Sequence, residues 1–186
     1  RGFLNLLPVY LDHILYPTLS DAGFVTEVHH VNGDGEDAGV VYCEMQGREN
    51  TGFSIMHRRL LQLMYPGHCG YKSETGGMMA ALRELDVQRV RAYHRQYYRA
   101  DNLCIVVSGK VAAADVFAAL EPVERRVVAK GQLPPMERPW STPVPPLLHG
   151  TTERVQFPSD DASTGHVLLG WREPVWPEQE IGRAHV

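Results

Sequence analysis

The chain has 186 residues, of which 44% are hydrophobic, and its formal net charge is −4. This length and composition predict a globular protein of one domain, or of one domain and part of a second. Basic and acidic residues are interleaved without a basic stripe, and no apolar run approaches the ~20 residues of a membrane helix, so we expect neither a nucleic-acid partner nor a membrane partner.

Amphipathic patterns predict helices along most of the first two thirds of the chain. Pro8 either kinks the first of these helices or opens it at Leu7. Ser20 and Asp21 are suited to cap a short helix before the turn at residues 32–35, and Asp86 is a good N-cap for the helix that follows it. The longer predicted helices cover residues 3–16, 52–64, 78–85, 87–98 and 113–127.

Residues 36–48 are compatible with two structures. Residues 40–42 (Val-Val-Tyr) favour a strand by propensity, whereas Asp37, Val41 and Glu44 would share one face of a helix. Glu44 stands among apolar neighbours, and a buried acid is costly unless it is paired or bound to metal. From the residues alone, a salt bridge or an exposed position is favoured over a metal ligand.

Extended segments are predicted in the second half. Residues 103–107 form a continuous apolar run between Asn102 and Gly109, which predicts a buried strand in which Cys104 is an inert thiol. Residues 131–150 contain Pro134, Pro135, Pro139, Pro143, Pro145 and Pro146, and this composition predicts an extended linker. Two further strands are predicted at residues 153–157 and 165–171.

No complete catalytic motif is present in the sequence. Among the nine histidines, neither H-E-x-x-H nor H-x-x-E-H occurs. His29 and His30 are adjacent and would point in different directions, so a structural role is favoured over a metal role. The three cysteines are an odd number at unrelated spacings, which favours reduced thiols in a cytosolic or matrix compartment over a disulfide framework. Gly76-Gly77 is best explained as a turn.

One nonapeptide nevertheless points to a family. Residues 39–47 resemble the Gly-Val-Val-Tyr-x-Glu-Met-x-Gly segment of pitrilysin-type zinc metallopeptidases (inverzincins), on a branch close to presequence protease and insulin-degrading enzyme. Four further blocks resemble the same branch in the same order, and together the likeness covers about residues 2–175. These blocks are residues 7–13, 26–30, 71–79 and 97–109.

The resemblance implies roles for particular residues. Glu44 matches the third zinc ligand of the family and is expected in a helix, with one zinc ion per active site. Asp37 matches an acid that helps to orient the metal site without binding the metal itself, and Glu36 is a weaker candidate for that role. His30 and His94 match no metal position. No catalytic residue of the family falls within these 186 residues.

The resemblance also implies an α+β fold, in which an antiparallel sheet is covered by helices and such units occur in pairs. Residues 1–130 would be the C-terminal portion of the first unit, residues 131–150 the linker and residues 151–180 the opening strands of the second. The last six residues, 181–186, resemble translated sequencing adapter and are expected to be an artefact.

The expected activity is that of a fragment. The H-x-x-E-H motif of the family lies several tens of residues before the ligand glutamate, farther than the 43 residues that precede Glu44. We therefore expect an inactive piece of an intracellular zinc metalloendopeptidase, and we favour the cytoplasm over the mitochondrial matrix. Its expected partners are unfolded peptide substrates and the missing remainder of its own chain.

Two alternatives are weighed against this interpretation. The first is a non-catalytic pitrilysin-like subunit or structural core protein, although such proteins often lose the ligand glutamate. The second is an α+β interaction module in which Glu44 forms an ordinary ion pair. The sequence upstream of Arg1 would discriminate between an active and a non-catalytic relative.

Overall fold

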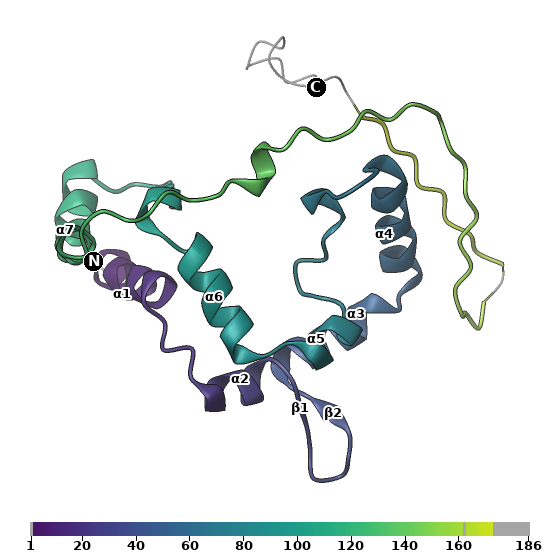
Figure 1. The fold of residues 1–186 in the computed structure, drawn as a ribbon, viewed down its shortest axis with the longest axis horizontal. Helices are drawn as coiled ribbons and strands as arrows, with labels where there is room; N and C mark the ends of the chain where they lie inside the picture. The colour runs from purple at the N-terminus through teal and green to yellow at the C-terminus, as the bar shows by residue number, and fades with distance from the viewer. Residues whose placement is uncertain (1, 162, 173–186) are drawn as a thin grey trace. The chain divides into compact units, whose positions relative to one another are not determined.

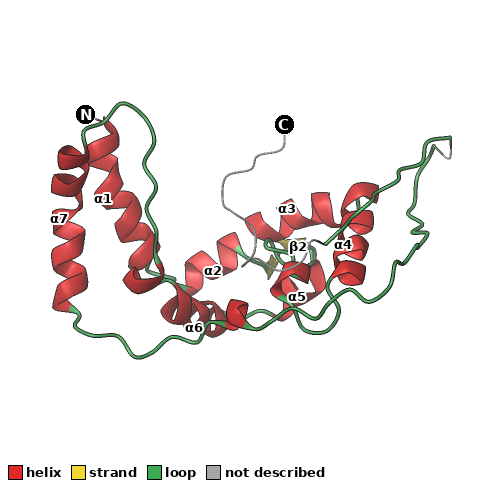
Figure 2. Ribbon diagram, turned by 90° about the horizontal axis from the view of Figure 1, so that it is seen from above, coloured by secondary structure: helices red, strands yellow, loops and turns green. Residues whose placement is uncertain are grey.

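The computed structural model describes residues 2–161 and 163–172, and most of its regular structure is helical (Figure 2). The chain divides into two compact units. Unit 1 comprises residues 1–42 and 80–139, and unit 2 comprises residues 43–79 and 140–186. The predicted adapter-derived residues 181–186 lie outside the described residues.

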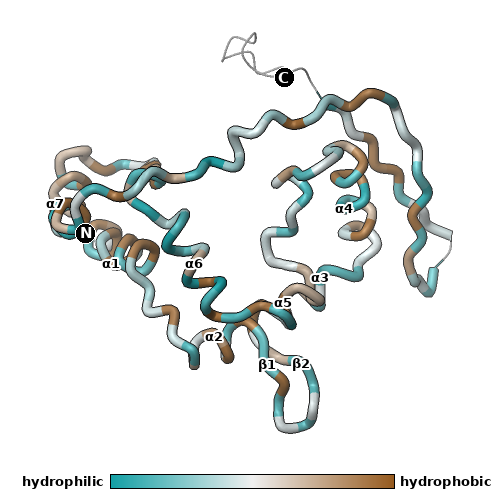
Figure 3. Tube along the Cα trace, in the orientation of Figure 1, coloured by the Kyte–Doolittle hydropathy of each residue, from teal (hydrophilic) through white to brown (hydrophobic). Residues whose placement is uncertain are grey.

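Unit 1 is built around two helices that lie side by side, α1 (Gly2–Leu15) and α7 (Ala113–Ala129) (Figure 1). Leu7 and Leu11 of α1 pack with Val116 of α7 to form its buried core. Partly buried side chains surround these three; they are Leu4, Leu103, Val107, Val111, Leu120 and Val123. Apolar residues are frequent along both helices (Figure 3), and α1 continues through Pro8 rather than opening at Leu7.

Helices α2 and α6 of unit 1 begin where polar caps were predicted. Ser20 accepts a hydrogen bond from the Gly23 amide at the start of α2 (Asp21–Glu27). Asp86 accepts one from the Arg89 amide at 2.9 Å, at the start of α6 (Val87–Tyr97). Each cap satisfies an amide that the first helical turn leaves without a backbone partner. The short helix α5 (Met79–Glu84) precedes α6.

The sheet in the described residues is a two-stranded antiparallel hairpin. Strands β1 (His30–Val31) and β2 (Asp37–Ala38) pair His30 with Ala38 and Val31 with Asp37. The predicted turn joins them, and the side chain of Asn32 accepts hydrogen bonds from the amides of Asp34 and Glu36. An α+β composition is therefore present, in the coarse form of many helices and one small sheet.

Helix α3 (Val40–Glu49) resolves the ambiguity of residues 36–48 in favour of a helix. The prediction that Asp37 and Glu44 share a helical face is wrong, because Asp37 lies in β2, before the helix begins. Gly39 separates the two elements with φ of +125°, in the region that side-chain-bearing residues rarely adopt. A Cβ on Gly39 would lie 2.5 Å from the carbonyl oxygen of Val28.

In unit 2, the remainder of α3 packs against the loop that precedes α5. Met45 is 2% exposed and lies against Gly76, where an added Cβ would collide with its sulfur atom. Glu49 accepts a hydrogen bond from the Met79 amide at 2.7 Å. The predicted turn at Gly76-Gly77 is confirmed, with φ of +84° at Gly77, and its first glycine permits this close packing.

Helix α4 (Gly52–Met64) is the longest helix of unit 2, and Thr51 caps it by accepting a hydrogen bond from the Ser54 amide. Residues 151–157 and 164–170 lie against it. Phe157 contacts Gly52, and Leu60 and Met64 lie close to Gly170. Glu153 forms an ion pair with Arg59 at 2.6 Å.

The three predicted strands in the second half are wrong for this structure. Residues 103–107, 153–157 and 165–171 form no strand, because none of them pairs its backbone with another described segment. Leu103 and Val107 still pack on the α1–α7 core, but Cys104 is exposed rather than buried. Within the described part of the chain, no helix is both long and apolar enough to cross a membrane.

Candidate functional site

Glu44, the predicted zinc ligand, lies in the middle of α3 with its carboxylate open to solvent. Its side chain is 63% exposed, and its oxygen Oε1 lies 3.4 Å from Nη1 of Arg48, one helical turn later. An ion pair between two exposed side chains at this distance is weak. The carboxylate is therefore accessible to a further ligand, and Arg48 is its neighbour of opposite charge.

One carboxylate does not make a zinc site. Zinc sites in proteins use three or four protein ligands. Among residues 2–161 and 163–172, no group of three or more histidine, cysteine, aspartate or glutamate side chains is arranged to hold a metal ion. The described residues therefore fit zinc through a single ligand, Glu44, and do not complete its coordination.

Asp37, the other predicted site residue, is the centre of a polar cluster in unit 1. Its Oδ1 lies 2.7 Å from Nε2 of His29, and its Oδ2 accepts hydrogen bonds from the hydroxyl of Tyr42 at 3.0 Å and from Nε of Arg83 at 2.9 Å. Arg83 also donates to the Tyr42 hydroxyl. We call these four residues the Asp37 cluster.

The electrostatics of the Asp37 cluster keep its carboxyl ionised. The hydrogen bond with His29 and then that from Arg83 lower the pKa of Asp37 from 3.8 to about 2. Since an ionised carboxylate only accepts hydrogen bonds, we assign the shared proton to Nε2 of His29. Tyr42 is fully buried, and this burial, followed by its bond to Asp37, raises the pKa of its phenol.

The arrangement suits support rather than direct ligation. Both oxygens of Asp37 already accept hydrogen bonds, from side chains on β1, α3 and α5 or their flanks. The rings of His29 and Tyr42 are also in contact, with centroids 5.0 Å apart. Asp37 therefore joins segments that are distant in sequence, as a residue behind a ligand shell does.

The other candidates lie outside this cluster. The main-chain amide of Glu36 donates to Asn32 in the hairpin turn, and the Glu36 residue is exposed. Nδ1 of His30 bonds the carbonyl oxygen of Val25, and Nε2 of His94 bonds that of Ile14, each at 2.8 Å. These contacts agree with the structural interpretation of the histidines.

Arg83 and Tyr42 are site residues that the sequence did not reveal as partners of Asp37. Tyr42 lies within the nonapeptide, where its hydroxyl gave no sign of an acidic partner. Arg83 is 46 residues from Asp37, and its neighbours in sequence carry no motif. Local sequence patterns do not report pairings of this kind.

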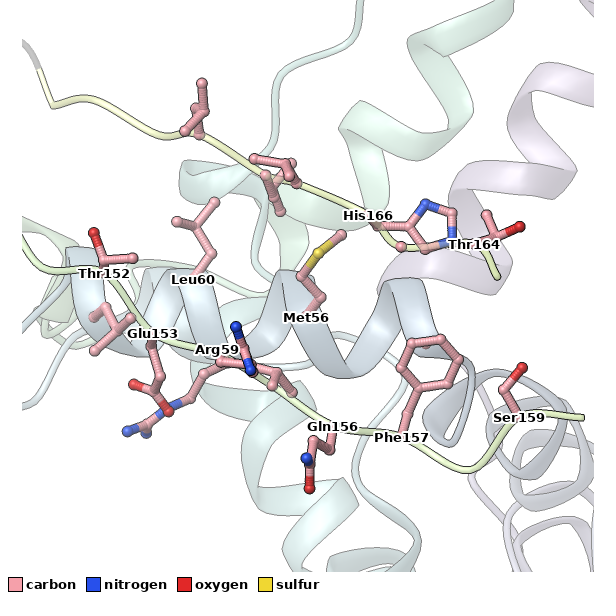
Figure 4. Close-up of a pocket in the computed structure, with 18 of the residues that line it drawn as sticks. Met56, Arg59, Leu60, Thr152, Glu153, Gln156, Phe157, Ser159, Thr164 and His166 are labelled. Atoms are coloured by element: carbon pink, nitrogen blue, oxygen red, sulfur yellow. The ribbon is translucent and has the colours of Figure 1, made fainter. Parts of the chain in front are cut away.

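Unit 2 also contains a groove that is large enough to hold a ligand. It has a volume of about 790 Å³ and lies between α4 and residues 151–161 and 164–169. Figure 4 shows Met56 and Leu60 of α4 facing this space, with Arg59 and Glu153 together and Phe157 and His166 on the extended segments.

Comparison with known proteins identifies the family. Residues 84–186 match the model described as the peptidase M16 inactive domain, which is more than half of the chain. The chain belongs to the peptidase M16 family. The resemblance to pitrilysin-type peptidases is thereby confirmed at the level of the family. Glu44 and Asp37 precede the matched residues.

Individual relatives agree with this assignment. An uncharacterised protein of Schizosaccharomyces pombe is 40% identical over 181 residues, which are 93% of this chain and 17% of that protein. An uncharacterised protein of Caenorhabditis elegans is 40% identical over 172 residues, 91% of this chain and 17% of the relative. Mitochondrial presequence protease of Xenopus tropicalis is 26% identical over 159 residues, 77% of this chain and 15% of that enzyme. The chain thus spans about one sixth of the length of these relatives.

Proposed function

We propose that these residues form part of a zinc metalloendopeptidase of the M16 family, in which Glu44 is the third zinc ligand. The observation that carries the proposal is the exposed carboxylate of Glu44, held on a helix within the Gly39–Gly47 nonapeptide and paired with Arg48 across the helix surface. The distant likeness to presequence proteases supports it. The match to an inactive domain begins at residue 84, after the proposed ligand.

On this proposal, Glu44 and Asp37 have different roles. Glu44 donates a carboxylate oxygen to the metal, and Asp37 stabilises the region from which α3 begins. Two histidine ligands and the glutamate base come from an H-x-x-E-H motif outside these 186 residues. Zinc supplies the Lewis acid that activates water for peptide hydrolysis. The 186 residues alone are then inactive, since Glu44 cannot hold the metal by itself.

We also propose that the remainder of a longer polypeptide covers part of unit 1. Helix α1 carries an exposed apolar stripe beside its buried one, formed by Phe3, Leu6, Tyr10 and Ile14, which are 38–64% exposed. A helix that is apolar on both faces is typical of a buried element. The relatives are about six times as long as this chain, and the proposed cover would come from the corresponding additional sequence.

The finer details of the fold belong to the same proposal. Residues 131–150 would link residues 1–130 to a second unit that starts at 151–180. Unfolded peptides would be the substrates. The three free cysteines support an intracellular location, for which we favour the cytoplasm over the mitochondrial matrix.

The test is zinc content and peptidase activity of the full-length protein that contains these residues. Glu44→Gln is expected to lose bound zinc and activity, because an amide is a poor substitute for a carboxylate ligand. Arg48→Gln is the matched control, since it removes the same ion pair but keeps the carboxylate. Equal loss in both variants, or zinc retained by Glu44→Gln, would refute the ligand role.

A non-catalytic M16 protein is the second candidate function. It is favoured by the description of the matched region as an inactive domain. The two functions differ in the sequence upstream of Arg1 of the full-length transcript. An intact H-x-x-E-H there supports the enzyme, whereas a replaced histidine or glutamate in that motif supports the non-catalytic relative.

A further inference from the structure

Arg83 is the member of the Asp37 cluster that comes from farthest along the chain. It projects from α5, donates from Nε to Oδ2 of Asp37 at 2.9 Å, and donates from Nη2 to the hydroxyl of Tyr42. Its guanidinium carbon also lies 5.2 Å from the centre of the Tyr42 ring. One planar side chain thus binds the acid before α3 and the aromatic residue within it.

These contacts fix the first turn of α3. Tyr42 has an exposed fraction of 0%, and its amide donates to the carbonyl of Val28 at 3.2 Å. Gly39, just before the helix, lies so close to Val28 that a Cβ would not fit. The first turn is therefore held by a side-chain network on one side and by close backbone packing on the other.

Glu44 has no comparable support of its own. Among the described residues, its polar partner is the exposed side chain of Arg48 at 3.4 Å, and such a pair does not fix a side chain in place. Its position depends on the helix that carries it. Tyr42 and Glu44 belong to the same helix, two residues apart, so anchoring the first restricts the backbone of the second.

We propose that Arg83 is a positioning residue for the zinc ligand Glu44, acting through Tyr42 and the first turn of α3. This inference rests on the proposed function for its metal, but its structural part does not. Arg83 orders the helix whether or not zinc is bound. It touches neither metal nor substrate in this role, and its contribution is to hold the ligand-bearing helix in one orientation.

The experiment uses the full-length protein with Arg83→Gln and Arg83→Lys. Arg91→Gln is the matched control, since Arg91 bonds the carbonyl of Leu19 at 2.9 Å and pairs with Asp21, so its loss weakens unit 1 elsewhere. Two quantities are measured: the hydrogen-exchange rates of the α3 amides and the dissociation constant for Zn²⁺ added to the metal-free protein.

Arg83→Gln is expected to accelerate exchange in the first turns of α3 roughly tenfold, the effect of losing hydrogen bonds from a charged group. Zinc affinity should fall about 10- to 100-fold, as for other residues that orient metal ligands. Arg83→Lys keeps the charge but not the planar fork, so it should lie between wild type and Arg83→Gln. If Arg83→Gln does not fold, Arg83→Lys is compared with wild type in its place.

The possible outcomes separate the two proposals. Unchanged exchange in α3 overturns the positioning role, whatever the metal does. Faster exchange with unchanged zinc affinity, in a protein where Glu44→Gln abolishes zinc binding, overturns the link from Arg83 to the ligand. If Glu44→Gln leaves zinc binding intact, the proposed function fails and the exchange data still decide whether Arg83 anchors α3. Equal effects of Arg83→Gln and Arg91→Gln indicate general destabilisation and also refute the inference.

Discussion

Replacing Leu11 by alanine tests the α1–α7 core, because Leu11 is 4% exposed and packs with Leu7 and Val116. The substitution removes three carbon atoms from contact with apolar neighbours, worth about 0.8 kcal/mol each. The surrounding side chains are only partly buried and can close part of the cavity. We therefore expect a loss near the lower end of the Leu→Ala range, about 2.5–3 kcal/mol in the free energy of unfolding.

Leu6→Ala is the matched control, on the same helix and with the same chemistry. Leu6 is 53% exposed, so its truncation removes few buried contacts. Alanine also has slightly higher helix propensity than leucine. We expect its cost in the 186-residue chain to stay within about 0.5–1 kcal/mol, several times less than that of Leu11→Ala.

Urea unfolding followed by far-ultraviolet circular dichroism provides the assay. With a slope of about 2 kcal/mol per molar urea, Leu11→Ala should lower the midpoint by roughly 1.3–1.5 M. Trp140 and Trp171 belong to unit 2, so tryptophan fluorescence is followed as a separate signal. It should change less than the dichroism, which includes α1 and α7.

Equal costs for the two substitutions in the 186-residue chain would refute the packing of α1 against α7 as described. The same pair also tests the proposed cover of α1. In the full-length protein, Leu6→Ala should become as costly as Leu11→Ala if another segment buries the exposed stripe. An unchanged small cost there would show that the stripe stays open to solvent.

Two further predictions concern the start of α3. Gly39→Ala should lower the free energy of unfolding by about 2 kcal/mol or more, because Gly39 has a φ of +125° and an added Cβ would lie 2.5 Å from the carbonyl oxygen of Val28. Gly35→Ala is the control, since Gly35 has a φ of +80° but open space around it. It should cost less in the same urea assay. The folded-state pKa of Asp37 is depressed from 3.8 to about 2, chiefly by His29, so its carboxylate stabilises the fold fully above about pH 4 and this contribution disappears as pH falls through about 2. Asp37→Asn should therefore show a flatter dependence of stability on pH in that window, and a slope equal to that of wild type would contradict the assignment.

The sequence was sufficient to locate most helices, because helical structure is decided by neighbours within a few residues. The caps at Ser20 and Asp86 and the turn after Asn32 are local side-chain bonds to the backbone, and each was found where it was predicted. The nonapeptide indicated both the family and a helix around Glu44, against the strand propensity of residues 40–42. These features need no knowledge of the rest of the fold.

The extended segments could not be predicted in the same way. A strand exists only when its backbone pairs with a neighbour, and the apolar run at residues 103–107 has no such neighbour among the described residues. Propensity reported that these residues suit a pleated, half-buried surface. Propensity does not indicate whether a neighbouring strand is present to form that surface. Without one among the described residues, Cys104 is exposed rather than buried.

For the candidate site, the sequence by itself determined Glu44 and Asp37 as acids of interest, and the tertiary structure decided what surrounds them. The structure separates Asp37 from α3 at Gly39 and joins it to Arg83, 46 residues later, and to the buried hydroxyl of Tyr42. Contacts between distant segments depend on how the chain folds back on itself. The local sequence pattern therefore determines which residues are available for a site, and long-range packing determines which of them come into contact.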